Sequence, residues 1–275
     1  MRKNTVVPVP EALRKRAPRN AVATSERILQ AAIQEFAENG YMGARIDAIA
    51  KRADANMRML YHYFGNKSGL YLKVLENVFG DIRQQELMLN LQDAAPLEAI
   101  TKLFEFTYAH FASNPLFVRI LTGENLANAR HLHESALVPS LSSPLLTEIR
   151  KVLERGEREG VFKRGLDPLQ LYVSIVSLSY FHISNGPTLS WIFSADLQDA
   201  SWREARREHA RSMLLCYLLI DPSKVAEGLG SKLESKLAVE LESNLNPSAV
   251  ASSGPLTPAV SQRRIKKNAV AGSQS

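Results

Sequence analysis

The sequence predicts an all-α protein built of a small N-terminal and a larger C-terminal helical domain. Apolar residues recur at helical spacing in nearly every periodic segment, and no run alternates convincingly as a β-strand would. Prolines and glycines stand at the ends of these segments, and Pro115 and Pro168 fall in first turns, where proline is tolerated. A chain of 275 residues with 45% hydrophobic and 23% charged residues has a globular composition and can bury one or two cores.

Capping and breaking residues predict four N-terminal helices. The hydroxyls of residues 24–25 can cap a first helix, which Gly40 ends. A second helix is expected over residues 46–53 and a third over residues 57–64, and a long fourth helix begins after Asn66. The apolar residues expected to face inward on the first and fourth helices are Ile28, Ala32, Ile33, Phe36, Leu70, Val74, Val78 and Ile82.

A break at residues 93–96 separates these helices from the rest of the chain. Beyond it, helical periodicity predicts segments near 96–112, 115–130, 142–159, 168–184 and 200–220. After Pro222 the composition shifts to Ser, Ala, Pro and Gly, which is typical of a flexible tail at residues 223–275. Leucines at every fourth position in this tail indicate a short amphipathic helix at residues 229–245, which is marginal on its own.

Positive charge gathers at both ends of the chain. Residues 1–20 hold six basic side chains against one acidic one, and residues 246–275 hold four basic side chains and no acidic one. The net charge is +6, so the body between the ends is mildly acidic. We expect residues 1–22 to form a disordered basic arm, because they are rich in proline and charge. Such arms attract phosphate backbones, although they can also serve solubility alone.

Several classes of protein are disfavoured by the sequence. Cys216 is the only cysteine, so an internal disulfide is impossible and a reducing cytoplasm fits best. It lies in an apolar run and is expected to fill the core. The apolar stretch at residues 171–183 contains serines and a histidine and is too short for a membrane span, and no secretory signal is expected. Enzyme motifs such as a phosphate-binding glycine loop are missing. We therefore expect no catalytic residue and no cofactor. No metal is expected either, because the side chains of His131 and His133 diverge on a helix.

Residues 45–64 have the pattern of a helix-turn-helix, in which two short helices cross with almost no linker. Ala50 permits the close approach of the helices, and Asp54 tolerates the left-handed backbone that the turn needs. Asn56 can cap the second helix. Apolar contacts would hold the pair against its neighbours through Ile46, Ile49, Leu60 and Phe64. The second helix of this motif enters the major groove of DNA, so the sequence predicts a DNA-binding domain at residues 23–67.

The segment Leu60–Lys67, followed by Leu70, resembles the signature of the TetR family of transcriptional regulators. The spacing from Ile49-Ala50 to this segment and the Gly40-Tyr41 pair agree with it, so the resemblance covers residues 24–75. The chain departs from the family pattern in two ways: Ala44-Arg45 replaces a usual pair of hydroxyl residues, and Asp54 replaces a usual glycine. The resemblance implies a cytoplasmic, nucleoid-associated repressor that binds DNA.

The resemblance also implies which side chains contact DNA. The residues expected to face the major groove are Met57, Arg58, Tyr61 and His62, and those expected at phosphates are Arg45, Tyr63 and Lys67. Arg58 can form a bidentate pair with guanine, or instead bind a phosphate, Asp47 or Asp54. The two tyrosines can alternatively pack with their hydroxyls at the surface. Arm residues that can follow a narrow minor groove are Arg14, Lys15, Arg16 and Arg19.

The C-terminal half, residues 68–222, resembles more weakly the regulatory domain of the RutR-like branch of the same family. The residues that carry this likeness are Asn114–Leu121, Glu124–Leu126, Asp167-Pro168, Leu171-Tyr172 and Asn185-Gly186. It implies a homodimer through the helices near 168–184 and 200–220. Their apolar residues exceed the need of two surface helices, and a twofold dimer would present two reading helices to a palindromic operator. Burial of these apolar residues within one monomer core is the alternative. The apolar residues of the two helices are Val173, Val176, Leu178, Met213, Leu214, Tyr217 and Leu218.

A small-molecule effector would bind between the helices of the C-terminal domain. Glu124, Asn128 and His131 recur on one helical face and can supply convergent polar groups, although the same face can simply be solvated. The other candidate lining residues are Tyr108, Phe111, Phe117, Tyr172, His182 and Trp191. We expect the effector to release the repressor from its operator. Control by a protein partner is the alternative, and neither the operator nor the effector can be named from the sequence.

Overall fold

The computed structural model describes residues 17–221, and within them the secondary structure is helical apart from one isolated bridge between Phe162 and Leu219. The all-α prediction is therefore confirmed. The helices are α2 (Ala17–Gly43), α3 (Ile46–Arg52), α4 (Met57–Phe64), α5 (Lys67–Leu87), α6 (Pro96–Ser113), α7 (Pro115–Leu126), the short 3₁₀ helix η1 (Leu132–Glu134), α8 (Leu137–Arg158), α9 (Pro168–Ser184), α10 (Gly186–Phe193) and α11 (Ala200–Leu218).

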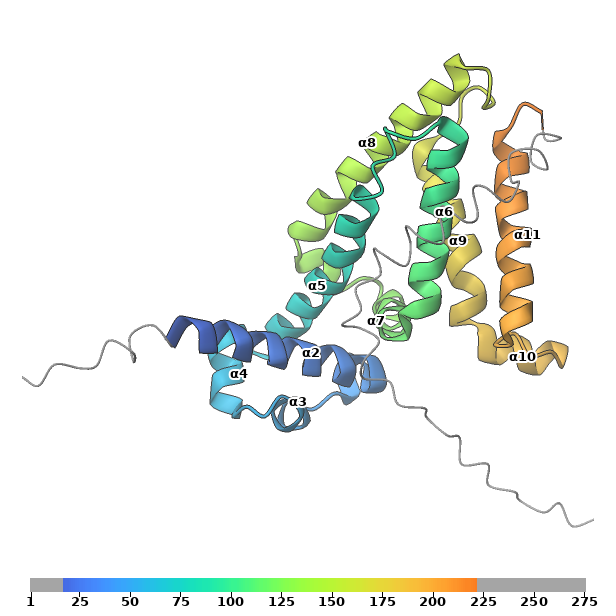
Figure 1. Ribbon diagram of the computed structural model, residues 1–275. Helices are drawn as coiled ribbons and strands as arrows, with labels where there is room; N and C mark the ends of the chain where they lie inside the picture. The colour runs from blue at the N-terminus through green and yellow to red at the C-terminus, as the bar shows by residue number, and fades with distance from the viewer. Residues whose placement is uncertain (1–16, 222–275) are drawn as a thin grey trace, which may run out of the picture.

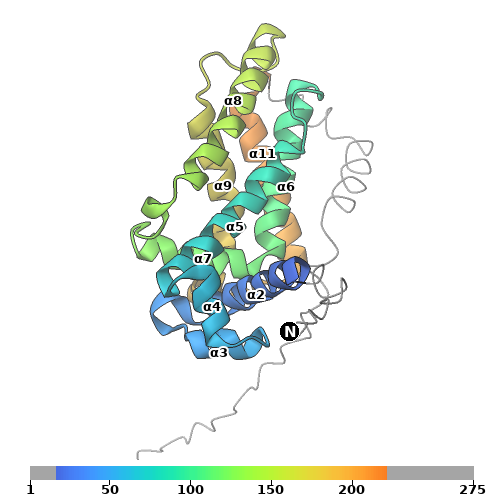
Figure 2. The same ribbon diagram turned by 90° about the vertical axis from the view of Figure 1, so that its left-hand side faces the viewer.

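The helices form a small head and a longer body (Figure 1). Helices α2, α3 and α4 make the head, and α5 rises from it beside α8. The body is completed by α6, α9 and α11, which stand side by side, while α10 lies across the end nearest the head. The turned view places α3 and α4 at the same extremity of the molecule (Figure 2). No helix among residues 17–221 is both long and apolar enough to cross a membrane.

The head and the body have separate apolar cores that meet at α7. The head core contains fully buried Ile28, Ile49, Leu60 and Leu70, together with Ile120 from α7. The main body core joins residues of α6, α8, α9 and α11. A third cluster packs α5, α6 and α7 around Phe106, Phe111 and Phe117. Since α7 contributes to the head core and to this third cluster, it connects the two parts of the chain.

Several helix ends differ from the sequence expectation. Helix α2 begins at Ala17, so residues 17–22 are helical rather than part of a disordered arm. The backbone leaves the helical conformation at Gly40, where φ is 65°, and one more turn follows to Gly43. Thr24, expected as a cap, therefore lies inside the helix. The tail, with its expected helix at residues 229–245, lies outside the described residues.

The boundaries differ more in the body. Helix α7 ends at Leu126 rather than near residue 130, because Asn128 and Ala129 adopt left-handed backbone conformations. Helix α8 starts at Leu137, five residues before the expected 142. The sequence expectation missed α10, whose Trp191, Ile192 and Phe193 are all exposed. An amphipathic pattern cannot reveal a helix that presents so little apolar surface to the core of its own chain.

Candidate DNA-reading surface and effector cavity

The turn between α3 and α4 has the geometry that the sequence predicts. Asp54 adopts a φ of 46°, in the left-handed region. The N–H of Ala55 donates to the carbonyl of Ala50 at 3.0 Å, which closes the turn. The side chain of Asn56 accepts a hydrogen bond from the N–H of Met59 at 2.8 Å and so caps α4. The two short helices therefore hold their mutual angle through local interactions.

A buried carboxylate fixes α3 to α2. Glu35 is 4% exposed and accepts a hydrogen bond from the backbone N–H of Arg45 at 3.1 Å, at the N-terminus of α3. Arg52, at the other end of α3, forms ion pairs with Glu35 at 3.5 Å and Glu38 at 2.8 Å. Neither Glu35 nor Arg52 stands out in the sequence as a functional residue. Glu35 supplies the acceptor that the usual hydroxyl cap would supply, since Ala44 is buried and the Arg45 side chain makes no cap.

The exposed face of α4 carries all four side chains expected in the major groove. Met57 and Tyr61 are 44% and 45% exposed, and Arg58 and His62 are exposed as well. Among residues 17–221, no ion pair forms at Arg58. Asp47, one of its possible partners, instead binds Arg45 at 2.8 Å. The apolar residue Leu60 faces inward and is fully buried, so α4 is anchored on one side and presents a mixed polar face on the other.

The backbones of α4 and α5 approach each other closely where the two helices meet. Gly65 has a φ of 75°, and the side chain of Asn66 accepts from the N–H of Gly69 at 2.8 Å, capping α5. A Cβ atom at Gly69 would overlap the carbonyl oxygen of Phe64. Nearby, the Lys67 ammonium donates to the carbonyl of Met42 at 3.3 Å. This ammonium also lies 5.1 Å from the ring centre of Tyr41.

The remaining predicted contacts are placed as follows. Tyr63 is half-buried and lies edge-on to His62, with ring centres 5.4 Å apart. Arg19 belongs to the first turns of α2 rather than to an arm. The other arm residues, Arg14, Lys15 and Arg16, lie outside the described residues.

Helices α9, α10 and α11 of the body carry exposed apolar side chains. Val173 of α9 and Tyr217 of α11 are 50% and 56% exposed. Leu214 and Leu218, which the sequence analysis grouped with them, instead lie in the body core. Val176 and Leu178 are half-buried. Cys216, expected to fill the core, is exposed on α11. The exposed apolar residues of these three helices are Leu169, Val173, Phe181, Trp191, Ile192, Phe193, Met213 and Tyr217.

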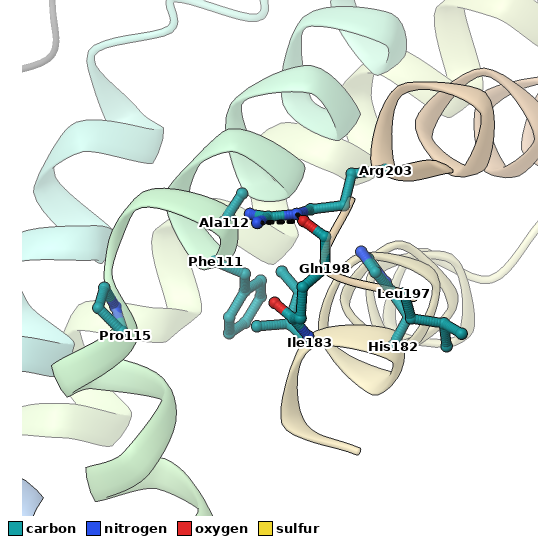
Figure 3. Close-up of a pocket in the computed structure, with 8 residues that line it drawn as sticks. All are labelled: Phe111, Ala112, Pro115, His182, Ile183, Leu197, Gln198 and Arg203. Atoms are coloured by element: carbon teal, nitrogen blue, oxygen red, sulfur yellow. Dashed lines mark hydrogen bonds between the residues drawn. The ribbon is translucent and has the colours of Figure 1, made fainter. Parts of the chain in front are cut away.

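A cavity of about 260 Å³ opens between the end of α6, the start of α7, the end of α9 and the loop before α11. Its lining residues are Phe111, Ala112, Pro115, His182, Ile183, Leu197, Gln198 and Arg203 (Figure 3). Two residues of the predicted effector site, Phe111 and His182, are among them. Tyr108 lies behind the wall, where its hydroxyl donates to the carbonyl of Arg203 at 2.9 Å and meets His182 Nε2 at 3.0 Å.

The other predicted effector residues lie elsewhere. Glu124 and His131 form a buried pair beside the head, and Asn128 is exposed in the loop between them, so the three do not share a helical face. Tyr172 is bound to Arg83 and Glu86 of α5. The remaining two are Phe117, which packs against Phe111 but does not line the cavity, and Trp191, which is 87% exposed.

The body core holds a second polar cluster between α5, α6 and α9. Glu86 is fully buried, and this burial raises its pKa to about 7 although Arg83 binds it at 2.8 Å. Burial also lowers the pKa of His110 to about 4, with the nearby Arg83 charge contributing. Both ring nitrogens of His110 are without a hydrogen-bond partner in the described structure. No group of three or more His, Cys, Asp or Glu residues within 17–221 is arranged to hold a metal ion.

Comparison with known proteins identifies both halves of the chain. Residues 28–74 match the family described as bacterial regulatory proteins, tetR family. Residues 96–214 match the tetracyclin repressor-like C-terminal domain. The chain is 36% identical to the HTH-type transcriptional repressor NicS of Pseudomonas putida over 176 residues, which are 64% of this chain and 83% of NicS. It is 25% identical to the HTH-type transcriptional regulator RutR of Escherichia coli K12, covering 70% of this chain and 89% of RutR.

Solved structures share the same architecture. The transcriptional regulator SCO4942 of Streptomyces coelicolor superimposes with a TM-score of 0.53 at 25% identity, over 71% of this chain and 98% of that one. The regulator FadR of Bacillus subtilis, solved in complex with stearoyl-CoA, has a TM-score of 0.53 at 18% identity, over 70% and 98% of the two chains. The latter likeness concerns the fold. With its helix-turn-helix head, its helical body and these relatives, the chain belongs to the TetR family of DNA-binding transcriptional regulators.

Proposed function

We propose that this regulator is a repressor that binds a palindromic operator as a homodimer and leaves it when a small-molecule effector binds the body. The observation that carries the proposal is the exposed face of α4. Four side chains able to contact bases lie on this face, and buried Leu60 anchors the helix to the head. Support for repression comes from NicS, which is named as a transcriptional repressor. The protein would act on DNA in the cytoplasm, at the nucleoid.

On the operator, α4 lies in the major groove. Asp47 is bound to Arg45 and does not compete for Arg58. The Arg58 guanidinium is therefore available for a bidentate contact with guanine. Met57, Tyr61 and His62 complete the base-facing surface. Phosphate contacts come from Lys67, Tyr63 and Arg45 at the rim of this surface, and from the basic residues at 14–19.

The dimer forms through the exposed apolar face of α9 and α11. Val173, Met213 and Tyr217 are each at least half exposed, and their burial against a second copy would remove apolar area from water at about 25 cal/mol per Å². A twofold axis through this face would place one α4 helix in each of two successive major grooves.

The effector site is the cavity lined by Phe111 and His182. The cavity touches the start of α7, and the other end of α7 packs beside the head. An effector that fits the cavity can therefore displace α7 and alter the spacing of the two α4 helices.

Selection of bound duplexes from a random DNA pool tests the proposal. We expect an inverted-repeat consensus with half-sites about one helical turn apart. Binding that shows no consensus and depends only on salt would contradict sequence-specific repression. Thermal unfolding with candidate metabolites then distinguishes a small-molecule effector from control by a protein partner, since only a ligand that binds the folded body raises the unfolding temperature.

A further inference from the structure

The chemistry of the cavity indicates which kind of effector it accepts. Its floor is formed by buried Phe111, His182 and Leu197, and its mouth by exposed Ala112, Pro115 and Gln198. A volume of about 260 Å³ corresponds to roughly nine water-sized volumes of about 30 Å³. The cavity therefore has room for a small metabolite.

The charged group in the cavity wall is Arg203. Its Nε and Nη2 atoms donate to the backbone carbonyl of Gln198 at 2.9 and 2.7 Å. Within residues 17–221 no carboxylate lies at ion-pair distance from this guanidinium. A guanidinium has five N–H donors, so Arg203 is held in place by one carbonyl and keeps further donors for a ligand. Figure 3 shows Arg203 and Gln198 together on one side of the cavity.

The surroundings of Arg203 do not neutralise its charge. His182 is buried, and this burial, with the charges of Arg206 and Arg203, lowers its pKa to about 4, so the ring is neutral at pH 7. Asp196 and Asp199 on the same loop are turned to the backbone N–H groups of residues 198 and 201–202. Glu204, on the first turns of α11, is bound to Arg207.

Besides Arg203, the polar members of the cavity wall are the Gln198 amide and the His182 ring. The apolar lining includes Phe111, Ile183 and Leu197. The amide of Gln198 packs so closely over Gly186 that a Cβ atom there would overlap it. The cavity thus combines a guanidinium and an amide with aromatic and aliphatic side chains.

We propose that the effector is a small organic monocarboxylate with a compact apolar or aromatic body, whose carboxylate binds Arg203 and the Gln198 amide. This inference rests on the proposed function only in calling the ligand an effector. A guanidinium suits a carboxylate because two parallel N–H···O bonds can form, and the apolar walls remove the body of the ligand from water.

Calorimetry on the full chain tests this proposal with benzoate as the probe and benzamide as its uncharged isostere. We expect benzoate to bind and benzamide to bind about 10- to 100-fold more weakly, as loss of charge-assisted hydrogen bonds implies. Arg203→Gln should weaken benzoate binding by a similar factor and leave benzamide nearly unchanged. Arg158→Gln, which removes an equal charge from the exposed end of α8, is the matched control and should bind benzoate as the parent does.

Three results would overturn the proposal: no benzoate binding, equal binding of benzoate and benzamide, or undiminished benzoate binding by Arg203→Gln. The comparison of the two probes on the parent chain stands even if the variant fails to fold. Operator binding measured without any probe tests the proposed repressor function separately. A chain that binds its operator but not benzoate would contradict the carboxylate assignment and leave the proposed repressor function intact.

Discussion

Glu124 binds His131 through both the backbone and the ring. Its carboxylate accepts from the backbone N–H of His131 at 2.7 Å and meets the ring Nδ1 at 3.0 Å, and it also accepts from the N–H of Leu132 at 3.0 Å. The His131 ring packs on Tyr41 of the head and Tyr71 of α5, with ring centres 4.2 and 4.9 Å away. The end of α7 is thereby fixed against the DNA-binding head.

Replacing Glu124 with alanine should therefore destabilise the junction of head and body. Two backbone N–H groups would lose their acceptor, at a cost of about 2–4 kcal/mol in the free energy of unfolding. Chemical denaturation measures this loss. Arg130→Ala, in the same loop but exposed, is the control and should change the unfolding free energy by less than about 0.5 kcal/mol. Equal stability of the two variants would contradict this account of the junction.

The proposed DNA contacts predict different responses from α4 and α5. Arg58→Ala should reduce affinity by about 1–3 kcal/mol and relax the preference at one base position. Lys67→Ala should weaken binding to all sequences alike and reduce the slope of log affinity against log salt by about 1. Titrations at several salt concentrations distinguish these effects. Lys151→Ala on α8, whose side chain pairs with Glu148, should bind DNA as the parent does.

The proposed dimer face predicts that Val173→Glu yields monomers. Placing a carboxylate at the centre of an apolar interface buries a charge without a partner, which costs several kcal/mol. Sedimentation or light scattering reports the mass, and operator affinity should fall with it. Met88 is 67% exposed at the end of α5, so Met88→Glu is a matched change outside the face and should leave the assembly intact. A dimeric Val173→Glu variant would contradict the assignment.

His110 predicts a specific pH dependence of stability. Its pKa in the folded chain, about 4, lies below the ordinary value of 6.5. The unfolded chain therefore binds a proton first, and stability is lost as pH falls from about 6.5 toward 4. Glu86 acts in the opposite direction, because its raised pKa of about 7 makes its contribution largest below 4.5 and diminishes it as pH rises through 7.

His110→Leu should thus flatten the fall in unfolding free energy between pH 6.5 and 4. It should also stabilise the chain modestly at pH 7, since two unpartnered ring nitrogens leave the core. Thermal unfolding across this pH range is the measurement. His133 is exposed, so His133→Leu is the control whose pH profile should match that of the parent. An unchanged slope in His110→Leu would refute the role of His110.

The surroundings of Gly69 and Gly123 predict opposite effects of substitution by alanine. Gly69→Ala should disrupt the head, because the new Cβ atom would overlap the Phe64 carbonyl oxygen in the backbone. Gly123 lies in α7 with open space around it, so Gly123→Ala should stabilise the chain by about 0.5–1 kcal/mol. Unfolding temperatures and operator affinity would both show the contrast. A Gly69→Ala variant as stable as Gly123→Ala would mean that the junction of α4 and α5 can yield.

The reading head could be predicted from the sequence because its determinants are local. Asp54 and Asn56 act within three residues of their own positions, so their backbone conformation and cap are legible in the chain. Glu35 could not be found in this way, since it accepts from Arg45 across ten residues and two helices. The predicted end of α7, near residue 130, was wrong for a similar reason. The Glu124 side chain offers the loop N–H groups a partner and makes an early stop favourable.

The cavity lay beyond sequence reasoning for a different reason. Phe111, His182 and Arg203 are brought together only by the packing of three helices and a loop. Aromatic spacing indicates Phe111, and His182 is a further lining candidate, but nothing in the sequence distinguishes Arg203 from a solvated arginine until its neighbours are known. The expected polar face at Glu124, Asn128 and His131 was instead divided between a buried pair and an exposed loop residue.

The absent side chain at Gly69 also sets the limits of exchange between related regulators. Because the start of α5 rests directly on the last carbonyl of α4, a chimera that carries a new recognition helix must keep glycine at position 69. With any larger residue there, the Cβ atom would push α5 away from α4, and the angle between the new helix and the body would change with it.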